Sequence, residues 1–240
     1  MTEKTVKTYY KELTYLISVN FLIGLVILFY NPTQNINYPT SYLIPIILET
    51  ILFSNIPLVI KDIIPESMIM KLVFIDHYKQ PLPSGRIFDE IENDSLIDYE
   101  NLISKYFSTK NLPKNYDESL RIWYKIYREH SEDPRAEQAQ KDFLFYRDSF
   151  GAILIIIIMT PIIILINHLL KINNMFEINY LILYFIILII ELVLYGYLTR
   201  LKSKSFVKGI LITASHIEKE KTNKTVEIYH KVIKNDNEIK

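Results

Sequence analysis

The chain has 240 residues, half of them hydrophobic, and its acidic and basic side chains balance to a formal net charge of zero. It has no cysteine, which excludes disulfides and thiolate metal sites. The apolar residues are concentrated in a few long runs, a distribution that is typical of membrane proteins.

The first two apolar runs predict a membrane hairpin within residues 1–64. Leu13–Tyr30 follows a lysine-containing tail, and no small-residue cleavage site comes after it. We therefore predict a retained span and not a signal peptide. A short uncharged loop, Asn31–Thr40, leads into a second span over Ser41–Ile60. Prolines in this second span are compatible with a helix that packs against neighbours.

Residues 65–148 form a polar, mildly acidic block that predicts a cytoplasmic helical domain. Met68–Tyr78 predicts a helix or strand, and a turn-rich break follows it. Ile87–Tyr106 predicts one or two acidic helices, and Asp117 can cap a further helix that ends near Ser131. The only tryptophan, Trp123, is expected to pack in this domain. The block is too short for a large enzyme core.

One long helix is predicted from Pro134 to Leu170. Asp133 is a suitable N-cap, and Pro134 suits the first helical position. Up to Phe150 the helix is charged, and from Ala152 onward it is almost entirely apolar. Roughly 20 apolar residues at 1.5 Å each cross a hydrocarbon core about 30 Å thick. The pattern predicts a helix that starts in water, crosses the bilayer and couples the cytoplasmic domain to the membrane.

A second hairpin is predicted over residues 149–199, with its fourth span at Ile178–Thr199 after the loop Lys171–Glu177. Residues 200–240 predict a basic tail, helical at first and frayed at its end. Lysine and arginine gather beside the spans everywhere except in the two short loops. The positive-inside rule therefore places both termini and the central block in the cytoplasm. The predicted fold is an all-α membrane protein, with four transmembrane helices in two hairpins and a cytoplasmic helical domain between the second and third.

Among the polar residues inside the predicted spans, four are candidates for pore lining or helix packing: Asn20, Glu49, Asn167 and Glu191. Such residues usually face a bundle interior or water, and both pore lining and helix-to-helix hydrogen bonding stay open for each. Glu191 lies roughly 13 Å and Asn20 roughly 10 Å from the inner ends of their helices, so the two share a level. Because one four-helix bundle encloses no aqueous path, a pore needs several subunits, and we predict a homo-oligomer, most simply a tetramer.

The sequence contains no phosphate-binding loop, nucleophile elbow or zinc-protease motif, and no enzyme activity, cofactor or metal is predicted. His130 lies in a segment of mixed charge that is more typical of a solvated helix end than of a metal site. An intramembrane enzyme or small transporter is a third possible class, and no reactive group of residues supports it.

Five short motifs occur in a fixed order ahead of the third span: Phe74-Ile75-Asp76, Leu82-Pro83, Trp123-Tyr124, Gln140-Lys141 and Tyr146-Arg147-Asp148. With the flanking hairpins, this order resembles the four-transmembrane, predicted pore-forming effectors encoded beside nucleotidyltransferases in bacterial antiphage (CBASS-like) defence systems. The resemblance covers nearly the whole chain. It implies an effector that senses a nucleotide or oligonucleotide made by a nucleotidyltransferase, opens in the lipid bilayer and arrests or kills the infected cell.

The motifs and the long helix together give the candidates for sensing and coupling: Asp76, Trp123, Tyr124, Gln140, Phe143 and Arg147. The alternative function is a non-conducting membrane receptor or scaffold that binds a partner through its cytoplasmic domain.

Overall fold

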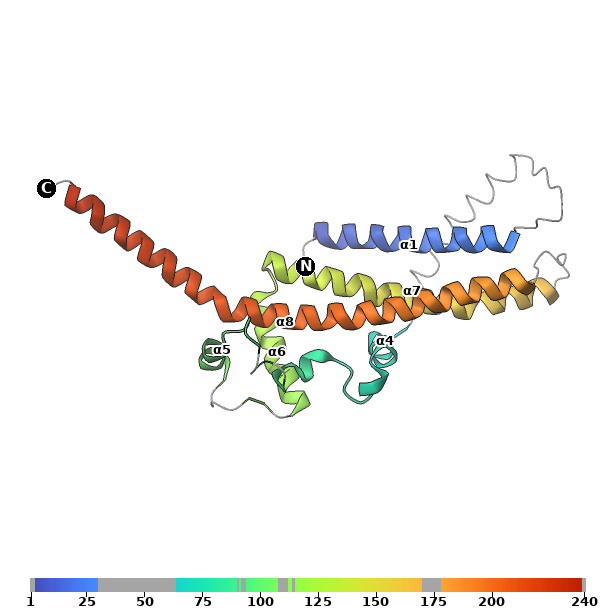
Figure 1. Cartoon of the computed structure of the whole chain (residues 1–240), viewed down its shortest axis with the longest axis horizontal. Coiled ribbons are helices and arrows are strands. Elements are labelled where there is room, and N and C mark those ends of the chain that lie inside the picture. The colour runs from blue at the N-terminus through green and yellow to red at the C-terminus, as the bar shows by residue number, and fades with distance from the viewer. Residues whose placement is uncertain are drawn as a thin grey trace. The chain divides into compact units, whose positions relative to one another are not determined.

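The structure of the chain, a computed structural model, describes residues 3–29, 64–89, 91, 94–107, 112–113, 115–169 and 178–238. Within these ranges the chain is mostly helical and contains no strand, which confirms the predicted helical class. Three long helices dominate: α1 (Glu3–Phe29), α7 (Pro134–Leu169) and α8 (Ile178–Glu238) (Figure 1). The predicted second span and both hairpin loops lie outside the described residues.

The chain divides into two compact units. Unit 1 consists of residues 1–81 and 141–202, and unit 2 consists of residues 82–140 and 203–240. Two of the three boundaries fall inside α7 and inside α8, and the third, between Pro81 and Leu82, lies outside any helix. This division differs from the predicted domain boundaries after residues 64 and 148, because the stretches 65–81 and 141–148 group with the membrane-type helices in unit 1.

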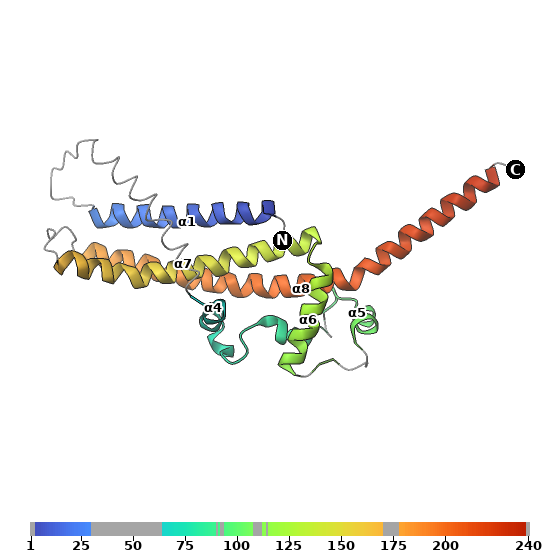
Figure 2. The same ribbon diagram turned by 180° about the vertical axis from the view of Figure 1, so that it is seen from behind.

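Within unit 1, α7 packs against both α1 and α8. Tyr9, Leu13 and Ile17 recur every four residues along α1, so they share one face, and this face packs on Ala152 of α7. A second cluster joins α7 to α8 and contains Ile153, Ile156, Tyr184 and Leu188. The three helices lie side by side in both views (Figures 1 and 2). The helix α1 begins at Glu3, ten residues ahead of the predicted span, and this extension brings Tyr9 into the core.

The predicted long helix is present as α7, from Pro134 to Leu169. Asp133 caps it as expected, since its Oδ1 accepts hydrogen bonds from the backbone N–H groups of Arg135 (2.8 Å) and Ala136 (3.4 Å). The helix continues through Gly151 and includes Pro161. The change from charged to apolar residues therefore occurs without a break in the backbone.

The helix α8 also continues where the sequence predicted a separate tail. It runs from Ile178 through Thr199 to Glu238 without interruption. Between those last two residues the sequence has no proline and a single glycine, Gly209, so nothing stops the helix where its composition turns charged.

Both α7 and α8 are long and apolar enough to cross a membrane. They differ in burial, because 56% of the most apolar stretch of α7 is buried and only 17% of that of α8. Along α8 the side chains of Ile190 and Val193 are 61% and 68% exposed. The core helix of a soluble protein buries such residues, whereas a helix in lipid leaves them on its surface.

Short elements complete the two units. In unit 1, α4 (Glu66–Val73) and the 3₁₀ turn η2 (Ile75–His77) replace the predicted helix or strand at 68–78. In unit 2, the 3₁₀ turns η3 (Pro83–Gly85) and η4 (Ile87–Asp89) precede α5 (Tyr99–Tyr106) and α6 (Tyr116–His130). The cap of α6 is Asn115 and not Asp117, because the Asn115 side chain accepts a hydrogen bond from the Asp117 N–H.

Candidate functional site

A polar pair joins α1 to α8 in the middle of the apolar part of unit 1. The side chain of Asn20 is buried, and its amide donates a hydrogen bond to the carboxylate of Glu191. The other side of this carboxylate, Oε2, is buried and has no hydrogen-bond partner among the described residues. Asn20 and Glu191, which the sequence predicts at a common level, are therefore in contact, and the second carboxylate oxygen of Glu191 lacks a hydrogen bond within the described residues.

A layer of charged residues lies where α7 changes from charged to apolar. Arg147 donates through Nη1 to Glu66 of α4 (3.0 Å) and through Nε to Asp148 (2.8 Å). The hydroxyl of Tyr9 on α1 also donates to Asp148. Both Arg147 and Asp148 are buried, so this is a desolvated polar cluster and not a surface ion pair.

Burial controls the protonation of this cluster. It raises the pKa of Asp148 to about 7 and lowers the pKa of Arg147. The hydrogen bonds from Arg147 and Tyr9 act in the opposite direction, since both stabilise the charged carboxylate. Burial therefore holds the pKa of Asp148 well above the usual value of an aspartate.

Three further ion pairs extend the charged layer around the same end of unit 1. Arg200 of α8 contacts Asp76 (2.9 Å) and also donates to the backbone carbonyl of Val73. The other two pairs are Lys202 with Asp142 (2.8 Å) and Lys141 with Glu12 (2.9 Å). The layer connects α1, α4, α7 and α8, and it lies directly beside the apolar runs of α7 and α8.

Unit 2 has an aromatic cluster instead. Trp123 of α6 stacks on Tyr127 with parallel rings at 5.4 Å, and Phe206 of α8 meets the indole edge-on at 5.6 Å. The indole N–H of Trp123 donates to the carbonyl of Val207 (3.2 Å). These contacts fix α6 on the part of α8 that belongs to unit 2. Trp123 is buried as expected, but it packs against α8 and not only within residues 65–148.

Two other sensing candidates lie next to that cluster. Tyr124 is exposed, and the guanidinium of Arg128 lies 6.0 Å from its ring centre. The side chain of Gln140 hydrogen-bonds to Tyr127, whereas its Oε1 is buried and has no partner among the described residues.

The sequence-predicted candidates fall into two groups. Trp123, Tyr124 and Gln140 belong to unit 2, and Asp76, Phe143 and Arg147 belong to unit 1. In unit 1 the guanidinium of Arg147 also lies 5.8 Å from the ring centre of Phe143. Glu49 lies outside the described residues, and Asn167 is placed as part of α7 without its side chain.

Several residues of the charged layer were missed by sequence reasoning, namely Tyr9, Glu12, Glu66, Asp142, Asp148, Arg200 and Lys202. Arg147 and Asp148 are adjacent charges immediately ahead of an apolar run, and this position was a usable signal. The partners of these charges depend on tertiary packing and carry no local signal.

His130, the residue considered for a metal site, contacts the hydroxyl of Tyr106 at 2.8 Å through Nε2. Among the described residues, no group of histidine, aspartate and glutamate side chains could hold a metal ion. Comparisons with protein-family models, with curated proteins and with solved structures give no match to this chain.

Proposed function

We propose that this protein is an oligomeric effector of a bacterial inner membrane that forms a gated ion-conducting pore. The exposed apolar surface of α8 and the apolar half of α7 support a membrane location. The proposed topology has four spans and places both termini and residues 65–148 in the cytoplasm, as the distribution of lysine and arginine requires.

Glu191 is the single residue on which the proposal of a pore depends most. A carboxylate inside a span is costly unless polar groups or water surround it. Asn20 supplies one hydrogen bond, and Oε2 has no partner in the described chain. The Glu191 side chain as a whole is only partly buried, so a water-filled lumen between several copies of the chain would hydrate its exposed part, which explains the residue better than helix-to-helix hydrogen bonding alone.

Continuity of α7 supports gating. Residues 134–140 of α7 belong to unit 2 and residues 141–169 to unit 1, and the helix has no break between them. A change in unit 2 can therefore act on the charged layer at Arg147 and Asp148 along one rigid helix. Arg147 pairs with both Glu66 and Asp148, so it would keep one partner if the other contact broke, and this suits the layer to rearrangement between two states.

The gating signal in this proposal is a nucleotide or oligonucleotide made by a nucleotidyltransferase, as the family resemblance implies. Unit 2 is the proposed receiver, since it contains Trp123, Tyr124 and Gln140. Arrest or death of an infected cell would follow from loss of the membrane potential.

Ion flux through reconstituted protein tests the proposal. Proteoliposomes with wild-type protein, with Glu191→Gln and with Glu118→Gln are compared for potassium flux and for cation-to-anion selectivity. Glu118 is exposed on α6, so its substitution is a matched loss of one carboxylate outside the membrane. We expect flux from wild type and from Glu118→Gln, with altered selectivity or conductance in Glu191→Gln alone.

The alternative, a non-conducting receptor or scaffold, predicts a different result. It predicts no flux from any of the three proteins under any candidate nucleotide. Native mass spectrometry in detergent adds an independent criterion, because a protein that is monomeric at every concentration cannot form the proposed pore.

A further inference from the structure

The short segment that contains α4 has an apolar surface on two opposite sides. Its inner side is formed by Ile69, Met70, Val73 and Phe74, all buried in unit 1. Its outer side, here named the outer face, consists of Met68, Leu72, Ile75 and Tyr78, which are 51%, 38%, 69% and 57% exposed. A surface helix in water normally places polar residues outward, so the outer face requires an apolar contact.

We propose that residues 66–79 lie along the cytoplasmic surface of the lipid bilayer, with the outer face in contact with the acyl chains and with Lys71 and Lys79 on anionic lipid phosphates. This inference rests on the proposed membrane insertion of α7 and α8, but it does not depend on conduction. The occupant of the outer face is lipid, and neither a protein partner nor a second copy of the chain.

The depth of the segment is fixed by two arginines. Glu66 at its start pairs with Arg147, and Asp76 near its end pairs with Arg200. Arg147 lies four residues before Gly151, roughly 6 Å along α7 from the start of the apolar run. The headgroup layer is roughly 5 to 8 Å thick on each side of the bilayer. Both anchors therefore hold the segment at the level of the lipid headgroups.

The contact at Arg200 gives the same depth from a second helix. Arg200 directly follows Thr199, the last residue of the predicted fourth span, and its guanidinium lies over the ring of Phe74 at 5.7 Å. The exposed apolar surface of α8 ends at the same level with Tyr197 and Leu201. Tyrosine at this position is typical of a membrane–water interface.

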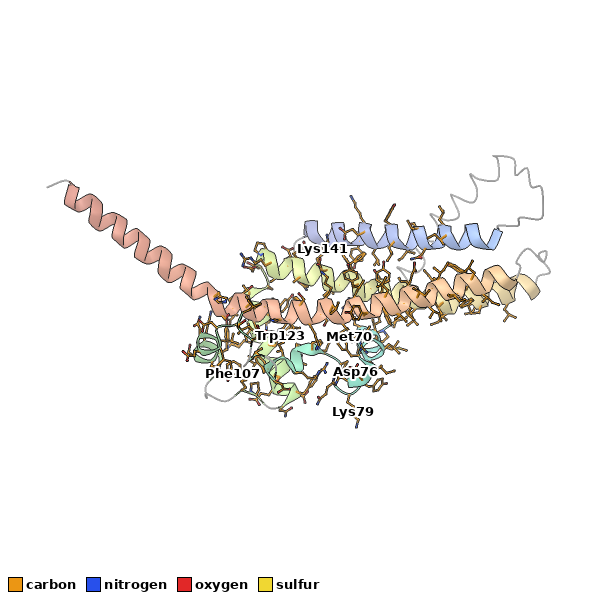
Figure 3. The ribbon with its side chains drawn as sticks, in the orientation of Figure 1. Met70, Asp76, Lys79, Phe107, Trp123 and Lys141 are labelled. Carbon is orange, nitrogen blue, oxygen red and sulfur yellow. The ribbon has the colours of Figure 1, made fainter. Side chains whose placement is uncertain are left out.

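The charges of the segment also match an anionic lipid surface. Its two carboxylates, Glu66 and Asp76, are occupied by the arginines of α7 and α8. Lys71 and Lys79 have no carboxylate partner within the described parts of the chain, and Lys71 lies over the ring of Tyr78 at 5.3 Å. Figure 3 shows Lys79 on the side of the segment that faces away from the long helices of unit 1, and Asp76 nearer to them. Lysines beside a buried apolar face attract anionic headgroups.

Site-directed spin labelling provides the test, because the chain has no native cysteine to remove. Single cysteines replace Ile75, Val193 and Glu118 in full-length protein, which is reconstituted in vesicles of phosphatidylethanolamine and phosphatidylglycerol. Collision rates with oxygen report lipid, and collision rates with a water-soluble nickel chelate report water. Met68→Cys repeats the measurement on the outer face in case Ile75→Cys perturbs folding.

We expect the label at position 193 to be lipid-exposed, the label at 118 to be water-exposed, and the labels at 68 and 75 to favour oxygen at a shallower depth than 193. If the labels at positions 68 and 75 collide with the nickel chelate as often as the label at position 118, while the label at position 193 is lipid-exposed, this inference is overturned and the membrane proposal stays intact. Labels at 68 and 75 that neither reagent reaches indicate burial by protein and also overturn it. A water-exposed 193 overturns both proposals together.

Lipid charge tests the role of the two lysines. Adding phosphatidylglycerol to phosphatidylcholine vesicles should increase the collision rate of the label at position 75 with oxygen relative to the nickel chelate. The double variant Lys71→Gln, Lys79→Gln should abolish this shift. The matched control is Arg121→Gln with Lys125→Gln, two exposed cations on α6, which should leave the shift unchanged. Absence of the shift in the wild-type background overturns the assignment of anionic headgroups.

Discussion

Asn20 of α1 hydrogen-bonds to Glu191 of α8, although the two residues are 171 positions apart in the sequence. The contact crosses the apolar part of unit 1, where α7 packs against both partner helices. In such surroundings a hydrogen bond specifies which helices are neighbours and at which register.

Removing only one partner of this pair should destabilise the protein more than removing both. Asn20→Leu leaves the Glu191 carboxylate without its donor, at a cost of about 1 to 3 kcal/mol in the free energy of unfolding. The double variant Asn20→Leu, Glu191→Leu removes the buried acceptor as well and should regain most of that loss. Denaturation in detergent measures all three proteins, with Val19→Leu on the exposed side of α1 as the control. Equal stability of the single and double variants would show that the hydrogen bond contributes nothing.

The stability of unit 1 should fall as pH rises toward neutrality. Because burial raises the pKa of Asp148 from 3.8 to about 7, the folded protein binds a proton that the unfolded chain releases between these values. The free energy of unfolding is therefore highest below about pH 4, falls by at most about 1.4 kcal/mol per pH unit, and levels off above about pH 7. Hydrogen bonds from Arg147 and Tyr9 move the midpoint to lower pH, and Glu66, which pairs with Arg147, is the other carboxylate of the cluster.

The melting temperature in detergent from about pH 5 to about pH 8 checks this prediction. Wild type should lose stability with rising pH over this range, whereas Asp148→Asn should show a flatter profile because its amide does not titrate. Identical profiles for the two proteins would remove Asp148 as the titrating group.

Local signals in the sequence were sufficient for α7. Asp133 and Pro134 fix its start, and the absence of any stronger breaker than Gly151 keeps it continuous into the apolar run. The shared level of Asn20 and Glu191 followed from helical rise alone, because two straight helices in one bilayer have the same vertical scale.

Pairings between distant charges could not be predicted in the same way. The sequence offers several acidic residues as possible partners of Arg147, and only the packing of the helices determines that Glu66 and Asp148 contact it. The segment after residue 199 was predicted to be helical at first, but its continuation in one helix to Glu238 was not predicted, for a different reason. Its composition changes from apolar to charged, which indicates that the chain passes from lipid to water. A helix ends only where a residue interrupts its backbone hydrogen bonding, and no such residue follows Thr199 in α8.

Membrane topology can be tested on both sides of the bilayer, at Gln34 and Asn174 and at Gln80 and Lys240, of which only Gln80 lies within the described residues. Single cysteines at Gln34 and Asn174 should react with a membrane-impermeant maleimide in intact spheroplasts, because lysine and arginine are nearly absent from these loops. Cysteines at Gln80 and Lys240 should react only after permeabilisation. Protection of position 34 in intact cells, with labelling after lysis, would invert the topology.

The role of α7 in coupling can be tested at Phe143, the third residue of the part of α7 that belongs to unit 1. Proline at this position removes a backbone N–H and clashes with the carbonyl of residue 139, at a cost of roughly 3 kcal/mol in the local helix. The apolar run beyond Gly151 is untouched, so Phe143→Pro protein should still insert and oligomerise. If unit 2 acts on the pore through a rigid α7, this variant should lose toxicity and signal-dependent flux.

Phe143→Ala is the matched control for that experiment. It removes the ring that lies near Arg147. Alanine has the highest helix propensity of all residues, so the helix stays continuous at this position. Loss of gating in both variants would assign the effect to the aromatic contact, and loss in the proline variant alone would assign it to helix continuity. Normal gating by a correctly inserted Phe143→Pro protein would exclude α7 as the coupling element, because no rigid helical path would then connect residues 134–140 with the charged layer at Arg147 and Asp148.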